Sequence, residues 1–401
     1  MASSGLVQMF APNRYPVAGG IPLRTQIAER LGCEVPIFAF SHCRDVVVEV
    51  TKAGGFGVLG AATFSPAQLE TELCWIDQHV SGRPYGVDVI IPTRYDRAVE
   101  AMSRAVEADD PATLIPEPHR AFMARLLEAE GVPELPDEER ARVHKEIIDG
   151  RGAMTPDGAR ALVRVVLRHP QVKLLVSALG APPEDLVAEL RQRDILLGAL
   201  CGKPAHAIRQ LQAGVQVIIA QGTEAGGHTG DISTLVLVPQ VVELCPADVP
   251  VLAAGGISRG SQIAAALALG AQGVWCGTIW LGTSESELTP FERQVLFDTR
   301  TEDAVRRCVR TGKTVRLTRS RLSEAWEQPG APGYLLPPLQ GILYNEAHAR
   351  VVRAGRADLC SIPAGQVVGT MHGETSVRGI MYQLKSEYVA TMERLASVAT
   401  A

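Results

Sequence analysis

The sequence predicts an α/β fold in which eight parallel strands close into a (β/α)8 TIM barrel. Two observations predict it: eight short apolar runs of strand length recur along the 401 residues, and helical patterns separate the later runs. Strand–helix alternation over this length implies a parallel sheet. Eight such units favour the closed barrel, and an open doubly wound sheet is the alternative.

The predicted strands are short runs rich in β-branched and apolar residues. They cover residues 35–40, 57–61, 85–91, 173–177, 194–200, 215–220, 251–254 and 273–277. Helical patterns lie at residues 45–55, 65–73, 183–193, 204–214 and 260–270. The second helix has a clear start, because Ser65 is a good N-cap and Pro66 a good first helical residue.

One segment interrupts this alternation after the third strand. Residues 93–158 are rich in Glu, Arg and Pro, with helical patterns at 119–131 and 137–150. The segment follows the strand on the side where barrel loops build active sites, so we expect a helical insert that caps the barrel. The alternative is a solvated helical decoration without a functional role.

The pattern becomes irregular again after Ser284, is basic through Arg321 and then Pro-rich, and ends in a helical stretch at 382–395. We expect a small C-terminal accessory region followed by a helix that returns to the barrel. The predicted barrel covers residues 25–92 and 159–297, with residues 350–401 returning to it. The predicted insert covers 93–158, and the predicted accessory domain covers 298–349.

Composition excludes several classes of protein. The net charge of −5 gives no reason to expect nucleic acid or an anionic membrane as a partner. The eight cysteines lack CxxC pairs, which is typical of reduced thiols in a cytoplasmic protein rather than of a disulfide frame or a zinc site. The N-terminus has no signal-peptide pattern, and no apolar run is long enough to cross a bilayer.

Paired glycines follow the last two predicted strands. Gly255 and Gly256 would let the backbone approach an anion, and the N–H groups of a helix that starts near residues 258–261 would point at the same place. Gly277 and Thr278 offer a second close backbone and a hydroxyl. Either loop alone is equally well explained as a tight turn. Together, on adjacent strands of a barrel, they predict a phosphate site, such as one for FMN.

The stretch QGTEAGGHTG, residues 221–230, follows the sixth predicted strand. Gly226 and Gly227 would let the chain pass close to a flat ring, and His228 could move a proton near neutral pH. A lone histidine is more often a hydrogen-bonded structural residue, but its position beside the phosphate loops favours a base. Glu224 is interpreted as a structural partner for backbone N–H groups. The other histidines show no metal-ligand spacing with a carboxylate or cysteine, so no metal is predicted.

Four stretches together resemble the nitronate monooxygenase, or 2-nitropropane dioxygenase-like, family. They are AGGFGVLGA, GVDVIIP, AQGTEAGGHTG and AAGGISRGSQIAAALALGAQGVWCGT. The similarity covers residues 35–92 and 170–283 and continues weakly through TGKTVR, PPLQG and IPAGQVVG. Relatives of this family include FMN-dependent enoyl-thioester and quinone reductases. The motifs are specific for the family but not for one activity within it.

The resemblance implies FMN, a flavin nucleotide, at the carboxyl-end mouth of the barrel, and it implies roles for particular residues. His228 occupies the position of the family's catalytic base. Lys203 could stabilise a reduced anionic flavin, and the alternative is that it is an ordinary surface lysine. The implied cofactor-binding residues are Asp88, Lys203, Gln221, Gly226, Gly227, Gly255, Gly256, Trp275, Cys276, Gly277 and Thr278. Asp88 stands where the family often has Asn, and a carboxylate there would disfavour the anionic reduced flavin. The first strand reads FAFSHCRD and brings His42, Cys43 and Arg44 near the site without an assigned role.

The resemblance favours an FMN-dependent oxidoreductase, a monooxygenase that oxidises nitronates or nitroalkanes with O2 and uses His228 as the base. The alternative is an FMN-dependent reductase that uses NAD(P)H to reduce an enoyl-CoA, a quinone or a similar acceptor, which the large insert and the altered first strand keep open. A flavin-binding protein without turnover is a third hypothesis, and the retained His228 argues against it. A homodimer is left open.

Overall fold

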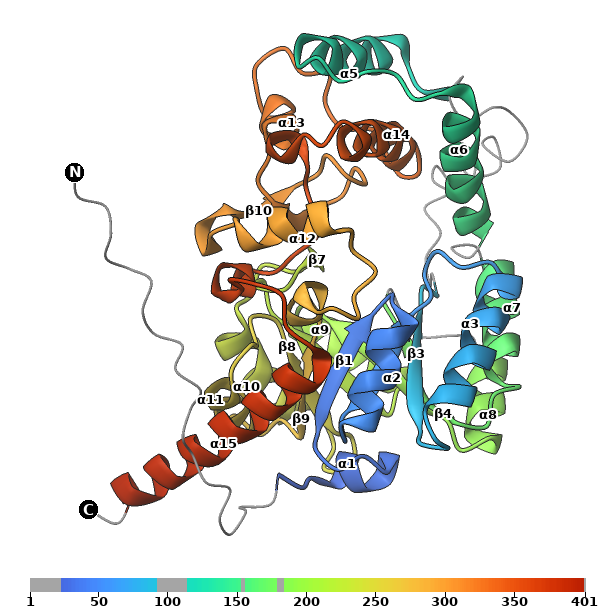
Figure 1. Ribbon diagram of the computed structural model, residues 1–401. Coiled ribbons are helices and arrows are strands. Elements are labelled where there is room, and N and C mark those ends of the chain that lie inside the picture. Colours follow the sequence, from blue (N-terminus) through green and yellow to red (C-terminus); the bar gives the residue numbers. More distant parts are fainter. Residues whose placement is uncertain (1–22, 92–113, 153–155, 179–183, 400–401) are drawn as a thin grey trace, which may run out of the picture.

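The computed structural model describes residues 23–91, 114–152, 156–178 and 184–399. Its main sheet is a closed barrel of parallel strands in the order β1-β2-β3-β4-β5-β6-β8-β9 (Figure 1). These strands are β1 (Ile37–Ser41), β2 (Phe56–Gly60), β3 (Tyr85–Val89), β4 (Val172–Ser177), β5 (Leu196–Cys201), β6 (Val217–Gln221), β8 (Val251–Ala254) and β9 (Gly273–Cys276). The predicted (β/α)8 fold is confirmed, and every predicted strand overlaps an observed one.

Helices form the outer layer of the barrel. They are α1 (Gln26–Leu31), α2 (Arg44–Lys52), α3 (Pro66–His79), α7 (Pro156–Val166), α8 (Glu184–Gln192), α9 (Pro204–Gln212), α10 (Thr234–Leu244), α11 (Gly260–Ala268) and α15 (Val377–Ala399). Ser65 caps α3 as predicted, in a capping box with Gln68 and with Pro66 as the first helical residue. The C-terminal helix α15 packs against both α11 and α2, so it completes the ring of helices after β9.

Side chains alternate along the strands between the two faces of the barrel wall. Phe38, Phe56 and Trp275 belong to a cluster that fills the interior, whereas Val87 and Cys276 belong to the cluster between strands and helices. The interior is therefore a packed core that leaves no room for a ligand inside the barrel.

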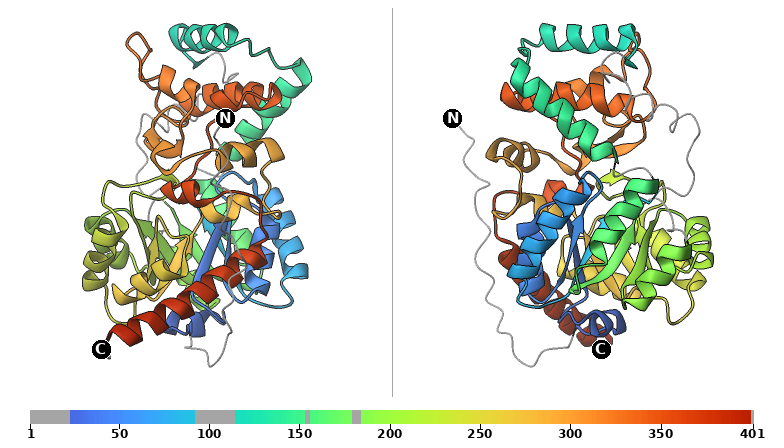
Figure 2. Two further views of the ribbon diagram at one scale, coloured as in Figure 1. Left: turned by 60° about the vertical axis from the view of Figure 1, so that its left-hand side comes forward. Right: turned by 90° about the vertical axis from the view of Figure 1, so that its right-hand side faces the viewer.

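A second layer lies beyond the carboxyl ends of the barrel strands (Figures 1 and 2). It contains α5 (Glu117–Ala129), α6 (Asp137–Gly152), α12 (Pro290–Phe297), β10 (Ala304–Arg307), β11 (Val315–Thr318), α13 (Arg321–Ala325) and α14 (Leu339–Arg353). The 3-10 helices η2 (Thr278–Gly282), η3 (Thr301–Asp303), η4 (Ala357–Leu359) and η5 (Gln366–Thr370) complete it.

The insert and the C-terminal region share one hydrophobic core in this layer. Met123 and Leu127 of α5 are buried in the same cluster as Leu322, Ile342 and Val351 of the C-terminal region. The described part of the insert is therefore packed against the accessory region and is not an isolated decoration. The domain boundaries themselves stay a prediction, and residues 93–113 and 153–155 of the insert lie outside the described residues.

A short antiparallel ribbon connects the barrel loop after β6 to the second layer. The strand β7 (Gly227–His228) pairs with β11, which pairs with β10. In register, Gly227 lies opposite Arg316 and His228 opposite Val315. The ribbon therefore fixes the backbone of the loop that carries the predicted base. Of the helices in the described ranges, none combines the length and apolarity needed to cross a membrane.

Candidate active site

His228 is held by the backbone of the ribbon at the mouth of the barrel. Its Nδ1 lies 3.0 Å from the carbonyl oxygen of Thr314. A carbonyl only accepts, so Nδ1 carries the hydrogen and, in the neutral ring, Nε2 carries the lone pair. No described residue hydrogen-bonds Nε2, and His228 is exposed toward the mouth. The arrangement leaves a neutral imidazole with one nitrogen ready to accept a proton.

The surroundings of His228 favour its neutral form. The ring keeps an accessible face, but the protein packed around it limits its hydration and lowers its pKa from the usual range near 6.5. The hydrogen bond to Thr314 acts in the opposite direction, and the positive charges of Lys313 and Arg310 lower the pKa further. His228 is thus mostly unprotonated at neutral pH, as a base must be. The same two cations favour an anion beside it.

Gly226 is required by the packing of the chain against itself. A Cβ at this position would lie 2.8 Å from the backbone of Ala364 and of Gly365. The sequence led us to expect that this glycine makes room for a flavin ring, and the structure gives a different reason. Gly227 has φ +75° and nothing within 4 Å of a Cβ position, so it is the glycine with open space around it.

Glu224 has the structural role that the sequence predicted. Its carboxylate accepts from the backbone N–H of Thr234 at 3.0 Å and from the Thr234 hydroxyl at 2.9 Å. Thr234 begins α10, so the carboxylate caps this helix. This bond fixes the far end of the loop that carries His228.

Two backbone donors are free at the loop after β8. Gly255 and Gly256 have φ values of +99° and +69°, which require glycine. The N–H groups of Gly256 and Ile257 have no hydrogen-bond acceptor in the part of the chain that the structure describes. On the adjacent strand, a Cβ at Gly277 would meet only Phe40, at 3.9 Å. These positions offer donors and space for a phosphate.

The N-terminus of α11 does not contribute to this site, contrary to the sequence-based expectation. The N–H groups of Ser258 and Arg259 donate to Oε1 of Gln262 at 2.8 and 3.0 Å. The N–H of Gly260 donates to the carboxylate of Glu387 on α15 at 2.9 Å. The prediction of free helical donors was wrong because the helix is capped by its own glutamine and by α15.

The residues of β9 differ in what they present to the mouth. Trp275 lies in the barrel interior next to Phe40, with ring centroids 6.0 Å apart, and contributes to the floor of the mouth. Cys276 points into the outer layer, and burial raises the pKa of its thiol to about 12. Only its backbone can face a cofactor. The hydroxyl oxygen of Thr278 accepts from the N–H of Gly365 at 2.8 Å and keeps its own hydrogen to donate.

Asp88 lies on the interior face of β3 and is 5% exposed. Burial alone raises the pKa of its carboxyl well above the ordinary value. Among the described residues, none donates a hydrogen bond or an ion pair to this carboxyl. Burial thus favours the protonated form of Asp88, which has a donor and an acceptor, as an amide has. The sequence-based objection that a carboxylate would disfavour an anionic reduced flavin does not apply to a neutral acid.

Gln221 and Lys203 are both available at the mouth. Gln221 follows the interior residues Val217 and Ile219 of β6 at strand spacing, and its amide has no partner in the described ranges. Lys203 precedes α9 and is exposed, without an ion pair to any described residue. The adjacent Gly202 packs against Gly230, with 3.1 Å from a Cβ position to the Gly230 nitrogen. The backbone of Lys203 therefore lies beside the loop that carries His228.

The residues of the unusual first strand have structural partners. Nδ1 of His42 lies 2.8 Å from the carbonyl of Gly60, at the rim of the barrel. The Cys43 thiol donates to the carbonyl of Glu285 at 3.0 Å. Arg44 pairs with Glu72 at 3.3 Å, and its guanidinium lies over the ring of Trp75, 4.4 Å from the centroid. Arg44 is thus engaged on the outside of the barrel.

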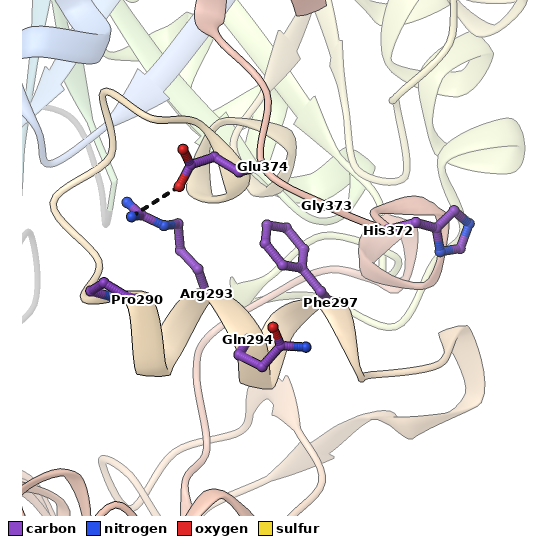
Figure 3. Close-up of a pocket in the computed structure, with 7 residues that line it drawn as sticks. All are labelled: Pro290, Arg293, Gln294, Phe297, His372, Gly373 and Glu374. Carbon is purple, nitrogen blue, oxygen red and sulfur yellow. Dashed lines mark ion pairs between the residues drawn. The ribbon is translucent and has the colours of Figure 1, made fainter. Parts of the chain in front are cut away.

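Two cavities lie away from this mouth. One of about 340 Å³ lies between α12 and residues 372–374, where Arg293 pairs with Glu374 at 3.0 Å (Figure 3). Another of about 550 Å³ lies between the insert helices and α14. None of the predicted catalytic or cofactor residues lines either cavity.

The mouth fits FMN in its donor set. Free backbone donors and an open glycine suit a phosphate, while a neutral acid, an amide and an indole floor suit a flavin ring. The fold and the mouth define an FMN-dependent oxidoreductase built on a TIM barrel.

Comparison with known proteins agrees with this class. A family model described as nitronate monooxygenase matches residues 127–387. The Mycobacterium tuberculosis protein Rv1533, described as a monooxygenase, is 44% identical over 379 residues, covering 93% of this chain and 98% of that protein. A Staphylococcus aureus protein described as a probable nitronate monooxygenase is 27% identical, covering 90% and 97%. The chain belongs to the nitronate monooxygenase family.

A solved structure is similar over nearly the whole chain. Nitroalkane oxidase from Streptomyces ansochromogenes has a TM-score of 0.72 at 29% identity and covers 92% of this chain and 99% of its own. The resemblance stated from the sequence is confirmed.

Proposed function

We propose that the protein oxidises nitronates and nitroalkanes with O2, with His228 as the base. The observation that carries this proposal is the hydrogen bond from His228 Nδ1 to the Thr314 carbonyl at 3.0 Å, which leaves Nε2 free at the mouth. Membership of the nitronate monooxygenase family gives the reaction class, and the ribbon β7–β11 gives the residue a fixed orientation.

The residues that would hold FMN come from four strand ends. Gly256 and Ile257, with Gly277 and Thr278, would bind the phosphate. The flavin ring would be lined by the side chains of Asp88, Lys203, Gln221 and Trp275. Gly226, Gly227, Gly255 and the backbone of Cys276 would complete the lining. When bound, FMN supplies the redox chemistry, taking electrons from the substrate and passing them to O2.

His228 acts on the carbon next to the nitro group. When a neutral nitroalkane binds, Nε2 accepts a proton from that carbon, and the electron pair of the broken C–H bond remains on the substrate as a nitronate anion. The Thr314 carbonyl then stabilises the imidazolium through Nδ1–H. Lys313 and Arg310, the cations that act on His228, favour the anion produced. A substrate that arrives as the nitronate does not need this proton transfer.

The reductase alternative requires cationic contacts for a dinucleotide pyrophosphate, but Arg44 and most of the arginines between 306 and 321 have other partners. Arg44 is held by Glu72 and Trp75. The ion-paired residues between 306 and 321 are Arg306 with Asp231, Arg307 with Glu324, Arg319 with Asp303, and Arg321 with Glu130 and Asp358. Arg316 is buried and donates to the Thr223 carbonyl at 2.9 Å. These contacts leave Lys313 and Arg310 as the cations that act on His228, which supports a small anionic substrate over a dinucleotide.

The experiment that tests the proposal is O2 consumption by the FMN-loaded protein with a neutral nitroalkane and, separately, with its nitronate. We expect both to support O2 consumption. Replacement of His228 should lower the rate of O2 consumption with the neutral nitroalkane far more than the rate with the nitronate. If neither substrate supported O2 consumption, the proposal would be rejected.

A further inference from the structure

A cluster of three potential metal ligands lies on the outside of the barrel, away from the mouth. Glu70 and Cys74 are one turn apart on α3, and His169 lies between α7 and β4. The ligating atoms of the three side chains all lie within 4.8 Å of one another. Helices α3 and α7 pack side by side, which brings the three residues together (Figure 1).

His169 is oriented as a metal ligand would be. Its Nδ1 lies 2.7 Å from a carboxylate oxygen of Asp77, whose other oxygen accepts from the hydroxyl of Tyr85 at 2.8 Å. The carboxylate places the hydrogen on Nδ1 and directs Nε2 toward Glu70, whose nearest oxygen is 3.6 Å away. A carboxylate that orients the second ring nitrogen is the usual companion of a metal-binding histidine.

The Nε2 atom is the second observation that points to a ligand. His169 is only 5% exposed, and its Nε2 is buried without a hydrogen-bond partner in the described part of the chain. Buried polar atoms of side chains are otherwise nearly always paired. The carboxylate of Glu70 and the thiol of Cys74 already interact with each other, so a metal ion held by all three side chains would give Nε2 the partner that it lacks among the described residues.

We propose that Glu70, Cys74 and His169 bind one divalent transition-metal ion, zinc by preference, with water in the fourth position. A thiol and an imidazole disfavour magnesium and calcium, which take oxygen ligands. Three protein ligands plus water form a tetrahedral zinc site. Bond lengths of about 2.0–2.3 Å require the ligand atoms to approach one another slightly, and the exposed Cys74 side chain can rotate to do so.

Binding changes the partners of two ligands. The Cys74 thiol donates to Oε1 of Glu70 at 3.8 Å, and the metal must displace this proton to form the sulfur–metal bond. One proton is released to solvent for each ion bound. Glu70 also pairs with Arg168, and a carboxylate can keep that pair on one oxygen while the other binds the metal. The bound ion would join α3 to the loop between α7 and β4.

Cobalt(II) provides a test that is independent of turnover. Untagged FMN-loaded protein, freed of metals by a chelator, would be titrated with Co²⁺ and followed by the near-ultraviolet thiolate-to-cobalt charge-transfer band. We expect saturation at one equivalent, displacement by Zn²⁺, and a rise in melting temperature on Zn²⁺ binding. Cys74→Ser should lose the charge-transfer band and the thermal shift, and Glu70→Gln should weaken Co²⁺ binding by at least about tenfold.

Cys33→Ser is the matched control, because Cys33 is also a free thiol but does not belong to the cluster of potential metal ligands. It should retain the band and the thermal shift. Three results would each overturn the proposal: no Co²⁺ binding, binding without a thiolate band, or a band that survives Cys74→Ser. Circular dichroism of each variant separates loss of ligation from loss of fold.

Discussion

His228 and Thr314 are 86 positions apart in the chain, and the histidine Nδ1 lies 3.0 Å from the threonine carbonyl. This single bond assigns the tautomer of the predicted base. It exists because β7 pairs with β11, so the accessory region, and not the barrel, orients the proton-accepting nitrogen. The C-terminal segment is therefore part of the proposed active site at the mouth of the barrel.

Replacement of the base should separate the two forms of the substrate. We expect His228→Asn to lower kcat/KM for a neutral nitroalkane by roughly 10²- to 10⁴-fold, the usual contribution of a general base. The value of kcat/KM for the nitronate should fall much less, because the nitronate is already deprotonated. Steady-state kinetics with both forms measures the difference. Equal losses would show that His228 positions the substrate without taking its proton.

The pH profile should report the lowered pKa of His228. A base works in its neutral form, so kcat/KM for a neutral nitroalkane should be constant near pH 7 and fall on acidification through a pKa below the usual 6.5. Lys313→Ala removes a positive charge that lowers this pKa, so the acid limb should move to higher pH by a fraction of a pH unit.

Lys52→Ala is the control for this shift, because Lys52 lies at the C-terminal end of α2, at the end of the barrel opposite the mouth. Its acid limb should coincide with that of the wild type. If Lys313→Ala left the acid limb of the pH profile in place, or moved it to lower pH, the profile could not be assigned to His228.

The neutral state of Asp88 has a consequence for stability. A carboxyl whose pKa is raised by folding stabilises the fold below its unfolded pKa, near 3.9, and this contribution is lost as the pH rises toward the folded pKa. Asp88→Asn should therefore become more stable relative to the wild type as pH rises, by about 1.4 kcal/mol per pH unit between the two pKa values. FMN should still bind.

Urea unfolding of the flavin-free proteins at several pH values measures this difference, and fluorescence titration measures FMN affinity. A stability difference that does not change with pH, or that favours the wild type increasingly as pH rises, would mean that Asp88 is ionised in the fold.

Gly226 should tolerate no side chain. In Gly226→Ala the new Cβ would lie 2.8 Å from backbone atoms of residues 364 and 365, which cannot move as a flexible side chain can. The shift of the loop should cost about 1–3 kcal/mol of stability, and misplacement of His228 should lower kcat/KM by up to about 100-fold.

Gly373→Ala is the matched control for that substitution, because a Cβ at Gly373 meets nothing within 4 Å and its φ is not in the left-handed region. Melting temperature and nitroalkane turnover should stay near the wild-type values. If Gly226→Ala behaved like this control, the packing of the loop would not position the base.

The barrel could be predicted from sequence because each strand is a local apolar run and each helix a local periodic pattern. The β7–β11 ribbon could not, since Gly227 and His228 form a two-residue strand whose partner lies far along the chain. The weak similarity at TGKTVR, residues 311–316, was the one available signal for that partner.

The predicted phosphate site keeps the N–H groups of Gly256 and Ile257 as free donors among the described residues but loses the expected donors of α11. The cap on α11 includes Glu387, 127 positions from Gly260, and no local pattern indicates such a contact. Spacing along the chain also concealed the cluster of Glu70, Cys74 and His169, because the histidine comes from a different barrel unit. Long-range packing decided each of these points, and sequence patterns report mainly local structure.

Anaerobic reduction of the bound flavin tests the central claim most directly. Stopped-flow absorbance would follow the oxidised flavin band after mixing with the nitronate of 2-nitropropane and, separately, with NADH and NADPH. The account predicts rapid bleaching by the nitronate, at a rate that supports turnover, and slow or no bleaching by either dinucleotide. Bleaching by NADH or NADPH at a rate that supports turnover, with the nitronate inert, would contradict it and establish the reductase instead.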